Sequence, residues 1–463
     1  MGTALKEGGQ EAPPTGFNLV GHLTSRIGLG SAARMTLSLI HSHGWDLAIT
    51  DIETGGAAAR VPLPVDGLRV VPLGAGPLSV NLLHMNAWQL MDGMFVMDAS
   101  IVTRLGGRFL TCVPYWEFEE FPHHWIEVLR AMDVVLAPTR FIAEAVERAV
   151  RDQRDRPEVI HFMQSVPVHE GVLADRCRWF PGREDSVVYL STFDFSSDAA
   201  RKNPMGALEA FERAFGGRTD VTLAFKTGHA TLPEAIAARD ELSRRAIDDG
   251  RIVLIEQQLT DAEMESLLVS ADVYVSLHRS EGLGLGMMES MALGVPVIAT
   301  GWSGNMDFMD DQNSIPVPFS MAPITGAYLH EYRTVERRLR WAEPDIEVAA
   351  GAMRDLADDT SRRAALGDAA RASMTARWTE YQKASALADV LGQADSDGWA
   401  ESHRRRLERL RADVRRRSVS PSKLIMDVKK LVVAGLRRLR LKPPRPQGER
   451  TPGPLREMDP YSL

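Results

Sequence analysis

The sequence predicts an α/β protein with parallel sheets, and three observations support this prediction. An apolar run over 273–277 breaks at a polar, glycine-rich turn, and a helical stretch over 287–293 then stops at Gly294 and Pro296. This order of strand, glycine turn, helix and strand is one unit of a parallel sheet. A second such unit begins at Phe17, and 463 residues suit two domains plus extensions. We therefore expect two Rossmann-like domains.

The unit near the N-terminus carries its own glycine turn. A strand over 17–22 meets a turn with Gly28 and Gly30, and a helix is expected from Ser31 to about His41. The two glycines allow a ligand to approach the backbone closely, although a plain tight turn would have the same sequence. Because the turn lacks the full GxGxxG pattern, we do not expect a dinucleotide site.

Two further segments of the first domain carry polar residues at strand ends. His84 and Asn86 follow a strand over 80–83, a location that favours function, while a single His is more often structural. Trp116 and Glu117 belong to the run YWEFE, which leaves the next strand. Aromatic rings beside carboxylates there would suit an exposed rim on which a sugar ring stacks.

The second domain opens with a pair of cations ahead of a helix. A polar, proline-rich stretch over 151–184 predicts the linker between the domains, and a strand begins at Val187. Arg201 and Lys202 stand directly before a helix that starts at Pro204. Two cations in this place would join the helix amides in binding a diphosphate, and a solvated surface pair is the alternative.

The glycine-rich turn of the second domain is the main candidate site. Ligands of parallel sheets bind beyond the carboxyl ends of the strands, where helix N-termini present free amides. Glu281 lies in the turn and Glu289 about one turn into the next helix, so both can face one ligand. The alternatives are a capping role for Glu281 and a solvated position for Glu289. Further ligand-binding candidates are Gly282, Leu283 and Gly284 of the turn, and Lys226 in the strand over 223–227.

Composition excludes several classes of protein. A hydrophobic fraction of 44% with 25% charged residues is ordinary for a globular protein. The only cysteines, Cys112 and Cys177, are far apart in the sequence, which argues against a disulfide scaffold and against a zinc site. No apolar run reaches 18 residues, and the leader over 1–16, expected to be disordered, lacks a signal core. We therefore expect a cytoplasmic protein.

The charge of the chain is unevenly distributed. The net charge is −8, but residues 401–463 hold 18 Lys and Arg against 7 Asp and Glu. Within residues 400–441 an apolar stripe with Lys and Arg on the other faces is typical of an interfacial helix. An anionic membrane surface is the expected partner of this tail. The alternative is that the tail packs on the acidic body, residues 1–400, or on a second subunit. Nothing predicts nucleic-acid binding by the body.

The segment EGLGLGMMESMALGVPV resembles the retaining nucleotide-sugar glycosyltransferases of family 4, which have the two-domain GT-B fold. The family signature is a Glu, seven residues and a second Glu, here Glu281 and Glu289. The segments TGWSGNMDF, RKNP, WEFEEFP and the N-x-x-H-x-N run around His84 are similar to one subset of the family. The resemblance spans about residues 17–395. It departs from the family at 192–196, where many members carry an Arg and this chain has no cation.

The resemblance implies a role for each matching residue. Glu281 lies by the donor sugar, Glu289 binds the ribose, and the Gly28 turn faces the cleft between the domains. Ser303 and Asn305 of TGWSGNMDF become candidates for the acceptor side of that cleft. The expected division of the chain is a leader over 1–16, an acceptor domain over 17–183, a nucleotide-sugar domain over 184–376, a crossover helix over 377–397 and a basic tail over 398–463.

The function that these features favour is transfer of a hexose from a nucleoside diphosphate sugar, with retention of configuration, to a glycan, lipid-linked or small-molecule acceptor. Lys202, Arg201 and the amides of the turn can stabilise a diphosphate leaving group without a metal, so no cofactor is expected. A sugar-nucleotide epimerase of the same fold and a non-catalytic nucleotide-sugar-binding partner protein are the alternatives. With the basic tail, the chain is expected at the inner face of the membrane as a peripheral protein.

Overall fold

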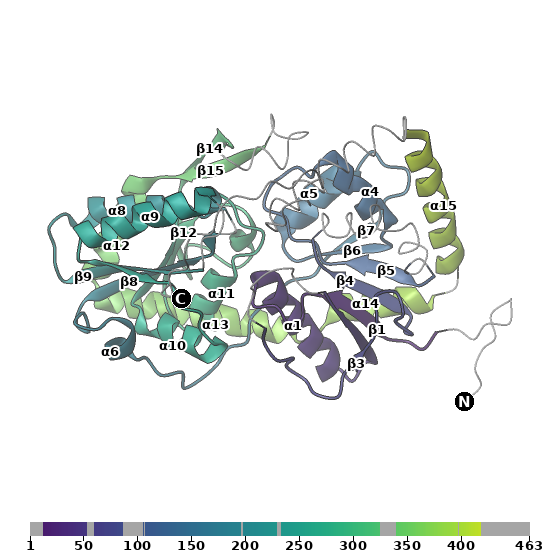
Figure 1. Ribbon diagram of the computed structural model, residues 1–463, viewed down its shortest axis with the longest axis horizontal. Helices are drawn as coiled ribbons and strands as arrows, with labels where there is room; N and C mark the ends of the chain where they lie inside the picture. Colours follow the sequence, from purple (N-terminus) through teal and green to yellow (C-terminus); the bar gives the residue numbers. More distant parts are fainter. Residues whose placement is uncertain are drawn as a thin grey trace, which may run out of the picture. The chain divides into compact units, whose positions relative to one another are not determined.

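The computed structural model describes two parallel sheets with accompanying helices (Figure 1). The residues that it describes are 13–52, 60–86, 105, 107–195, 198–228, 233–324, 339–396 and 398–417. The chain divides by compactness into residues 1–411 and 412–463, so that both sheets belong to the first unit. Most of the predicted tail, from residue 418 onward, lies outside the described residues, as do residues 1–12 of the leader.

The first sheet has seven parallel strands in the order β3-β2-β1-β4-β5-β6-β7. These strands are β1 (Phe17–Gly21), β2 (Leu47–Asp51), β3 (Arg69–Val70), β4 (Val80–His84), β5 (Phe109–Cys112), β6 (Val134–Ala137) and β7 (Glu158–His161). The helices of this region are α1 (Gly28–Ser42), α4 (His123–Ala131), α5 (Arg140–Val150), α14 (Ser385–Asp395) and α15 (Trp399–Arg417). Leu37 of α1 and Leu387 of α14 lie in one buried core with Leu82 of β4, so the chain returns to the first sheet near its end.

The second sheet has six parallel strands in the order β10-β9-β8-β11-β12-β13. They are β8 (Val187–Phe193), β9 (Val221–Thr227), β10 (Ile252–Ile255), β11 (Val273–Ser276), β12 (Val297–Thr300) and β13 (Ile315–Val317), and an antiparallel pair β14 (Phe319–Pro323) and β15 (Arg340–Pro344) follows. The helices are α6 (Arg176–Trp179), α7 (Ala199–Lys202), α8 (Pro204–Phe215), α9 (Pro233–Asp248), α10 (Asp261–Ser270), α11 (Leu285–Ala292), the 3-10 helix η3 (Gly304–Asp307), α12 (Ile346–Asp358) and α13 (Thr360–Tyr381).

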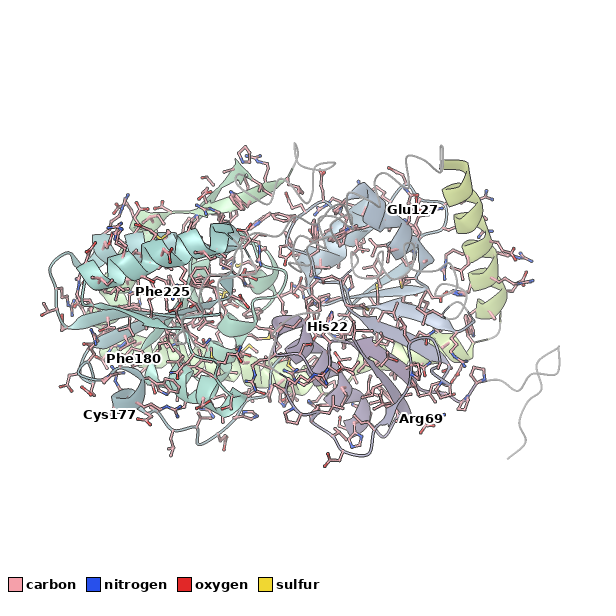
Figure 2. The ribbon with its side chains drawn as sticks, in the orientation of Figure 1. His22, Arg69, Glu127, Cys177, Phe180 and Phe225 are labelled. Atoms are coloured by element: carbon pink, nitrogen blue, oxygen red, sulfur yellow. The ribbon has the colours of Figure 1, made fainter. Side chains whose placement is uncertain are left out.

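Helices cover both faces of the second sheet, and each face has its own core. Phe225 of β9 packs with residues of α8, α9 and α12, whereas Phe180 lies in the core formed with α10, α11 and α13. Both side chains are fully buried, while Arg69 on β3 and Cys177 on α6 are exposed (Figure 2). Strands buried on both faces explain the nearly continuous apolar runs in the sequence.

The strand orders place the two glycine turns at corresponding points. In each sheet the order reverses once, between β1 and β4 in the first and between β8 and β11 in the second. Such a reversal opens a crevice beyond the carboxyl ends of the strands, where ligands of open α/β sheets bind. The turn with Gly28 follows β1, and the turn with Glu281 follows β11. Both predicted sites therefore lie at a reversal of strand order.

Some predicted helix boundaries are wrong. Helix α1 begins at Gly28 instead of Ser31, so both glycines lie in its first turn. A side chain at residue 30 would come 2.2 Å from the carbonyl oxygen of Ser25, which is why this position takes glycine. Helices α12 and α13 are separate, because Asp359 ends α12 and caps α13 by accepting from Arg362 N at 2.8 Å.

Among the described residues, no helix is both long enough and apolar enough to cross a bilayer.

Candidate active site

A cluster of opposite charges stands at the reversal point of the second sheet. Glu281, which follows β11, is 7% exposed and accepts a hydrogen bond from the ammonium of Lys202. Arg201 Nη1 lies 3.3 Å from the second carboxylate oxygen of Glu281 and donates to the Ser280 carbonyl at 2.7 Å. Two neighbouring cations from α7 thus hold one buried carboxylate. The structure brings together Arg201, Lys202 and Glu281, the three residues expected at the sugar and the diphosphate of the donor.

The local sequence fixes these two cations in place. Asp198 caps α7 by accepting from Ala200 N at 2.7 Å, and Asn203 ends the helix in the left-handed conformation, at φ 52°. Asn203 also caps α8 by accepting from Gly206 N, and its amide donates to the Leu277 carbonyl at 2.8 Å. A single Asn therefore ties the turn between α7 and α8 to the end of β11.

The charges in the cluster set the protonation of Glu281. Burial alone would raise the pKa of this carboxyl, but Lys202, Arg201 and His278 outweigh burial and hold the pKa at about 2. Burial lowers the pKa of Lys202, Arg201 lowers it further, and Glu281 opposes both. At neutral pH Glu281 is a carboxylate and has no proton to donate.

Arg201 and Lys202 are adjacent but differ in access. The Arg201 side chain is 4% exposed, and its Nη2 lies 3.8 Å from Glu117 of the first-sheet region. The Lys202 side chain is 21% exposed. Adjacent helical residues point about 100° apart, which separates the two in this way. Arg201 therefore positions the carboxylates of Glu281 and Glu117, whereas Lys202 remains within reach of a ligand.

The turn after Glu281 packs tightly and leads into an uncapped helix. Gly284 has φ 93°, a conformation that glycine adopts without strain, and it precedes α11 without capping the helix through a side chain. A side chain at Gly282 would come 2.9 Å from the Trp116 carbonyl oxygen. With Leu283 buried beneath the turn, the first amides of α11 remain available to an anion.

Glu289 lies one turn into α11 and has no cation beside it. Among the described residues its half-buried carboxyl forms no hydrogen bond or ion pair. Burial, followed by the charges of Asp261 and Glu265, raises its pKa to about 7. A carboxylate that is held in place and unpaired can accept hydrogen bonds from sugar hydroxyls.

The first glycine turn approaches this region directly. A side chain at Gly28 would lie 3.7 Å from Leu285 Cδ1, the first residue of α11. Met35 of α1 packs against the core that α11 shares with α10. The N-termini of α1 and α11 therefore lie against each other, with Gly30 closing the turn behind them.

Two predicted acceptor-side residues, Trp116 and Asn86, make contacts within their own loops. Trp116 is 1% exposed and packs among Phe118, Phe121 and Trp125, so the prediction that its ring forms an exposed stacking rim is wrong. Asn86 accepts from Tyr115 N at 3.1 Å and shapes the same loop. Four aromatic residues within ten positions collapse on each other, because burying them together removes a large apolar area from water.

Ser303 and Asn305 form hydrogen bonds with residues in and just before the Glu281 turn. The Ser303 hydroxyl accepts from Glu281 N at 2.8 Å, and the buried amide of Asn305 donates to the Thr300 carbonyl at 2.9 Å. The Oδ1 atom of Asn305 also lies 3.1 Å from Nε2 of His278. His278 is buried and was not among the residues predicted from the sequence. Its only sequence signal was its place three residues before Glu281.

The remaining candidates have different surroundings. His84 is fully buried, its ring lies 5.6 Å from that of Tyr115, and burial lowers its pKa to about 3, so it is neutral. Glu117 keeps 23% of its side chain exposed. Lys226 donates to the Thr227 carbonyl at 3.0 Å, and burial lowers its pKa against the opposing charge of Asp194.

The described residues contain no group of three or more His, Cys, Asp and Glu side chains that could hold a metal ion.

Comparisons with known proteins extend this description. A family model for family 4 glycosyltransferases in conflict systems matches residues 116–405. A GDP-mannose-dependent monoacylated alpha-(1-6)-phosphatidylinositol monomannoside mannosyltransferase of Corynebacterium glutamicum is 28% identical over 181 residues, which are 35% of this chain and 41% of that protein. The chain thus spans less than half the length of this curated relative.

Solved structures share the fold. Anabaena HepE in complex with UDP and glucose has a TM-score of 0.57 at 14% identity, covering 82% of this chain and 100% of that chain. A sucrose-phosphate synthase from Thermosynechococcus elongatus has a TM-score of 0.58 at 14% identity, with the same coverage. At this identity the likeness concerns the fold, and it confirms the predicted pair of parallel-sheet α/β domains.

Proposed function

Because the chain belongs to the family 4 glycosyltransferases of conflict systems and has the GT-B fold, we propose that it transfers a hexose from a nucleoside diphosphate sugar to an acceptor hydroxyl with retention of configuration. The observation that carries this proposal is the Lys202–Glu281 pair beside the uncapped N-terminus of α11. In this proposal residues 184–376 bind the donor and residues 17–183 bind the acceptor.

The cluster suits departure of a diphosphate. As the bond from the anomeric carbon to the phosphate oxygen breaks, negative charge grows on the leaving group, and Lys202 with the α11 amides would stabilise it. Arg201 stays with Glu281 and keeps the turn in shape. Since these groups supply the positive charge, we propose that the reaction needs no metal ion.

The acceptor proton needs a base, and Glu281 is a poor one. Its pKa of about 2 reflects strong pairing with two cations, so a proton gains little by moving there. We propose that the acceptor oxygen bonds to the anomeric carbon on the face that the diphosphate leaves, and that its proton departs with the diphosphate. Glu117, partly exposed at the same cluster, is then placed to accept hydrogen bonds from an acceptor sugar.

The start of the basic tail is engaged by the body of the protein. In α15, His403 lies 2.8 Å from Asp133 and Arg406 pairs with the same carboxylate. Arg409 donates to Asp155 at 2.7 Å. This part fits the alternative in which the tail packs on the acidic body. For the rest of residues 400–441 we propose contact with an anionic membrane surface, which would suit a lipid-linked acceptor and peripheral localisation.

Donor turnover without acceptor tests the proposal. The full chain would be incubated with UDP-glucose and with GDP-mannose, and free sugar and nucleoside diphosphate would be measured together. Slow release of both in equal amounts, lost in Lys202→Ala, supports a transferase. Conversion of the donor sugar to an epimer without nucleotide release would indicate the epimerase. Thermal stabilisation by a donor without any turnover would indicate a non-catalytic binding protein.

A further inference from the structure

Arg26 reaches from the first glycine turn to the second sheet region. It lies between β1 and α1, and its Nη1 donates to the carbonyl oxygen of Leu259, directly before α10. The same nitrogen lies 3.6 Å from Asp261, the first residue of α10. The Arg26 side chain is 28% exposed and that of Asp261 is 78% exposed. The contact is therefore open to solvent and to a ligand.

Three helix N-termini meet around this arginine. Helices α10 and α11 share one core, in which Leu267 packs with Met288, and Met35 of α1 packs against it. The first residues of α1 and α11, Gly28 and Leu285, are in contact. Arg26 precedes α1 by two residues and contacts the start of α10. Its guanidinium thus lies beside the N-termini of α1 and α10.

Asp261, the carboxylate beside Arg26, also acts on Glu289. After burial, the charges of Asp261 and Glu265 are what raise the pKa of Glu289. The group that Arg26 holds is therefore within electrostatic reach of Glu289. Lys202 pairs with Glu281, which precedes the N-terminus of α11. A donor lying along the start of α11 would meet Lys202 at its diphosphate and Arg26 near its nucleoside.

We propose that Arg26 is a further donor-binding residue, which closes from the first sheet region over the nucleoside end of the sugar nucleotide. The proposal rests on the transferase function above. A planar guanidinium can stack on a base or donate to its carbonyl oxygens. The Leu259 carbonyl and Asp261 hold the guanidinium in place, and a bound nucleoside takes up its remaining donors.

Nucleotide binding by single variants of the full chain tests this role. UDP, GDP and the monophosphates UMP and GMP would be titrated calorimetrically into the wild type, Arg26→Ala and Lys202→Ala. Loss of charged hydrogen bonds of this kind weakens affinity roughly 10- to 100-fold. We expect Arg26→Ala to weaken diphosphate and monophosphate binding by the same factor. The penalty of Lys202→Ala is expected to shrink for the monophosphate.

Arg178→Ala is the matched control, because Arg178 pairs with Glu263 on the same helix α10 without contacting α1. It should bind nucleotides as the wild type does. Asp261→Asn separates ligand binding from simple bridging, since it breaks the ion pair but leaves Arg26 in place. Equal or tighter nucleotide binding by Asp261→Asn supports the proposal.

Three results would overturn the proposal while leaving the proposed function in place. Wild-type affinity in Arg26→Ala removes any role for the residue in binding. If Arg26→Ala loses affinity for the diphosphates alone, Arg26 contacts a phosphate. If Asp261→Asn and Arg26→Ala lose nucleotide affinity equally, the Arg26–Asp261 pair acts as a bridge between the two sheet regions. If the wild type binds neither UDP nor GDP, the proposed function itself fails, and the role of Arg26 fails with it.

Discussion

Lys202 and Glu281, 79 positions apart, form a hydrogen-bonded ion pair where the strand order of the second sheet reverses. The pair joins the end of α7 to the turn after β11. A bound diphosphate would compete with Glu281 for the ammonium. The pair therefore keeps the Lys202 ammonium in place before the donor arrives. Pairing with Glu281 also makes burial of the ammonium less costly than burial of an unpaired lysine would be.

Replacing Lys202 with Ala should lower kcat by about two to three orders of magnitude, the range for removing one preorganised charge-stabilising group. Glu281 would keep its contact with Arg201, so the turn should stay folded. The measurement is kcat at saturating donor, with Lys383→Ala as control because Lys383 is exposed and pairs with the neighbouring Glu380. Near-normal turnover would rule out Lys202 as the stabilising cation.

Arg201→Ala should behave differently, because Arg201 is buried and positions its neighbours. In Arg201→Ala the buried Glu281 loses one of its two cations, and the Ser280 carbonyl loses the hydrogen bond from the guanidinium. Breaking a buried ion pair on one side costs about 3–5 kcal/mol. We expect a loss of this size in the free energy of unfolding, measured by urea denaturation, and a smaller loss in Lys202→Ala, because Arg201 also contacts the Ser280 carbonyl and Glu117. Equal stability of the two variants would contradict the division of roles.

The sequence predicted the fold more completely than the surroundings of individual side chains. The strand, glycine turn and helix around Glu281 follow from local patterns, and the structure and the comparisons confirm the two parallel-sheet domains. Arg201 and Lys202 looked alike because nothing local says which of two adjacent helical residues faces the core. The roles of these site residues stay predictions.

Long-range contacts account for what the sequence reading missed. Trp116 was expected in a sugar-stacking rim, where aromatic side chains flank two carboxylates, but its ring is buried against Phe121 and Trp125. The contact of Arg26 with Leu259 joins residues 233 positions apart. No periodicity in the chain encodes such a contact, because it depends on where the first helix meets the second sheet.

Donor affinity should depend on pH through Glu289, whose pKa is about 7. The carboxylate accepts hydrogen bonds from ribose hydroxyls better than the protonated acid, and the fraction of carboxylate falls as pH drops through 7. The donor KM should therefore rise between pH 8 and pH 6. Glu289→Gln should have a raised KM that no longer changes over this range, with kcat little altered. A loss confined to kcat would instead place Glu289 at the transferred sugar.

The same carboxyl should make stability depend on pH. Its folded pKa of about 7 lies above the ordinary value of 4.5, so the folded state binds the proton more tightly than the unfolded state. The stability associated with this proton is complete below about pH 4.5 and is lost as pH rises to about 7. Glu289→Gln should therefore raise the free energy of unfolding by about 1–3 kcal/mol at pH 8 and by much less at pH 5. Equal effects at both pH values would contradict the shifted pKa.

The last prediction concerns the basic tail. The ion pairs of α15 with Asp133 and Asp155 engage its first residues, so membrane binding should depend on the cations beyond it. Each Lys or Arg near an anionic surface contributes about 1 kcal/mol, and losing two should weaken partitioning at least about thirtyfold. We expect Lys429→Glu with Lys430→Glu to abolish co-sedimentation of the full chain with phosphatidylserine vesicles at low salt. Arg244→Glu, a reversal on the exposed face of α9, should leave it unchanged. Equal partitioning of all three proteins at low and at high salt would show that the tail does not bind membranes, and the acceptor would then have to be sought among soluble molecules.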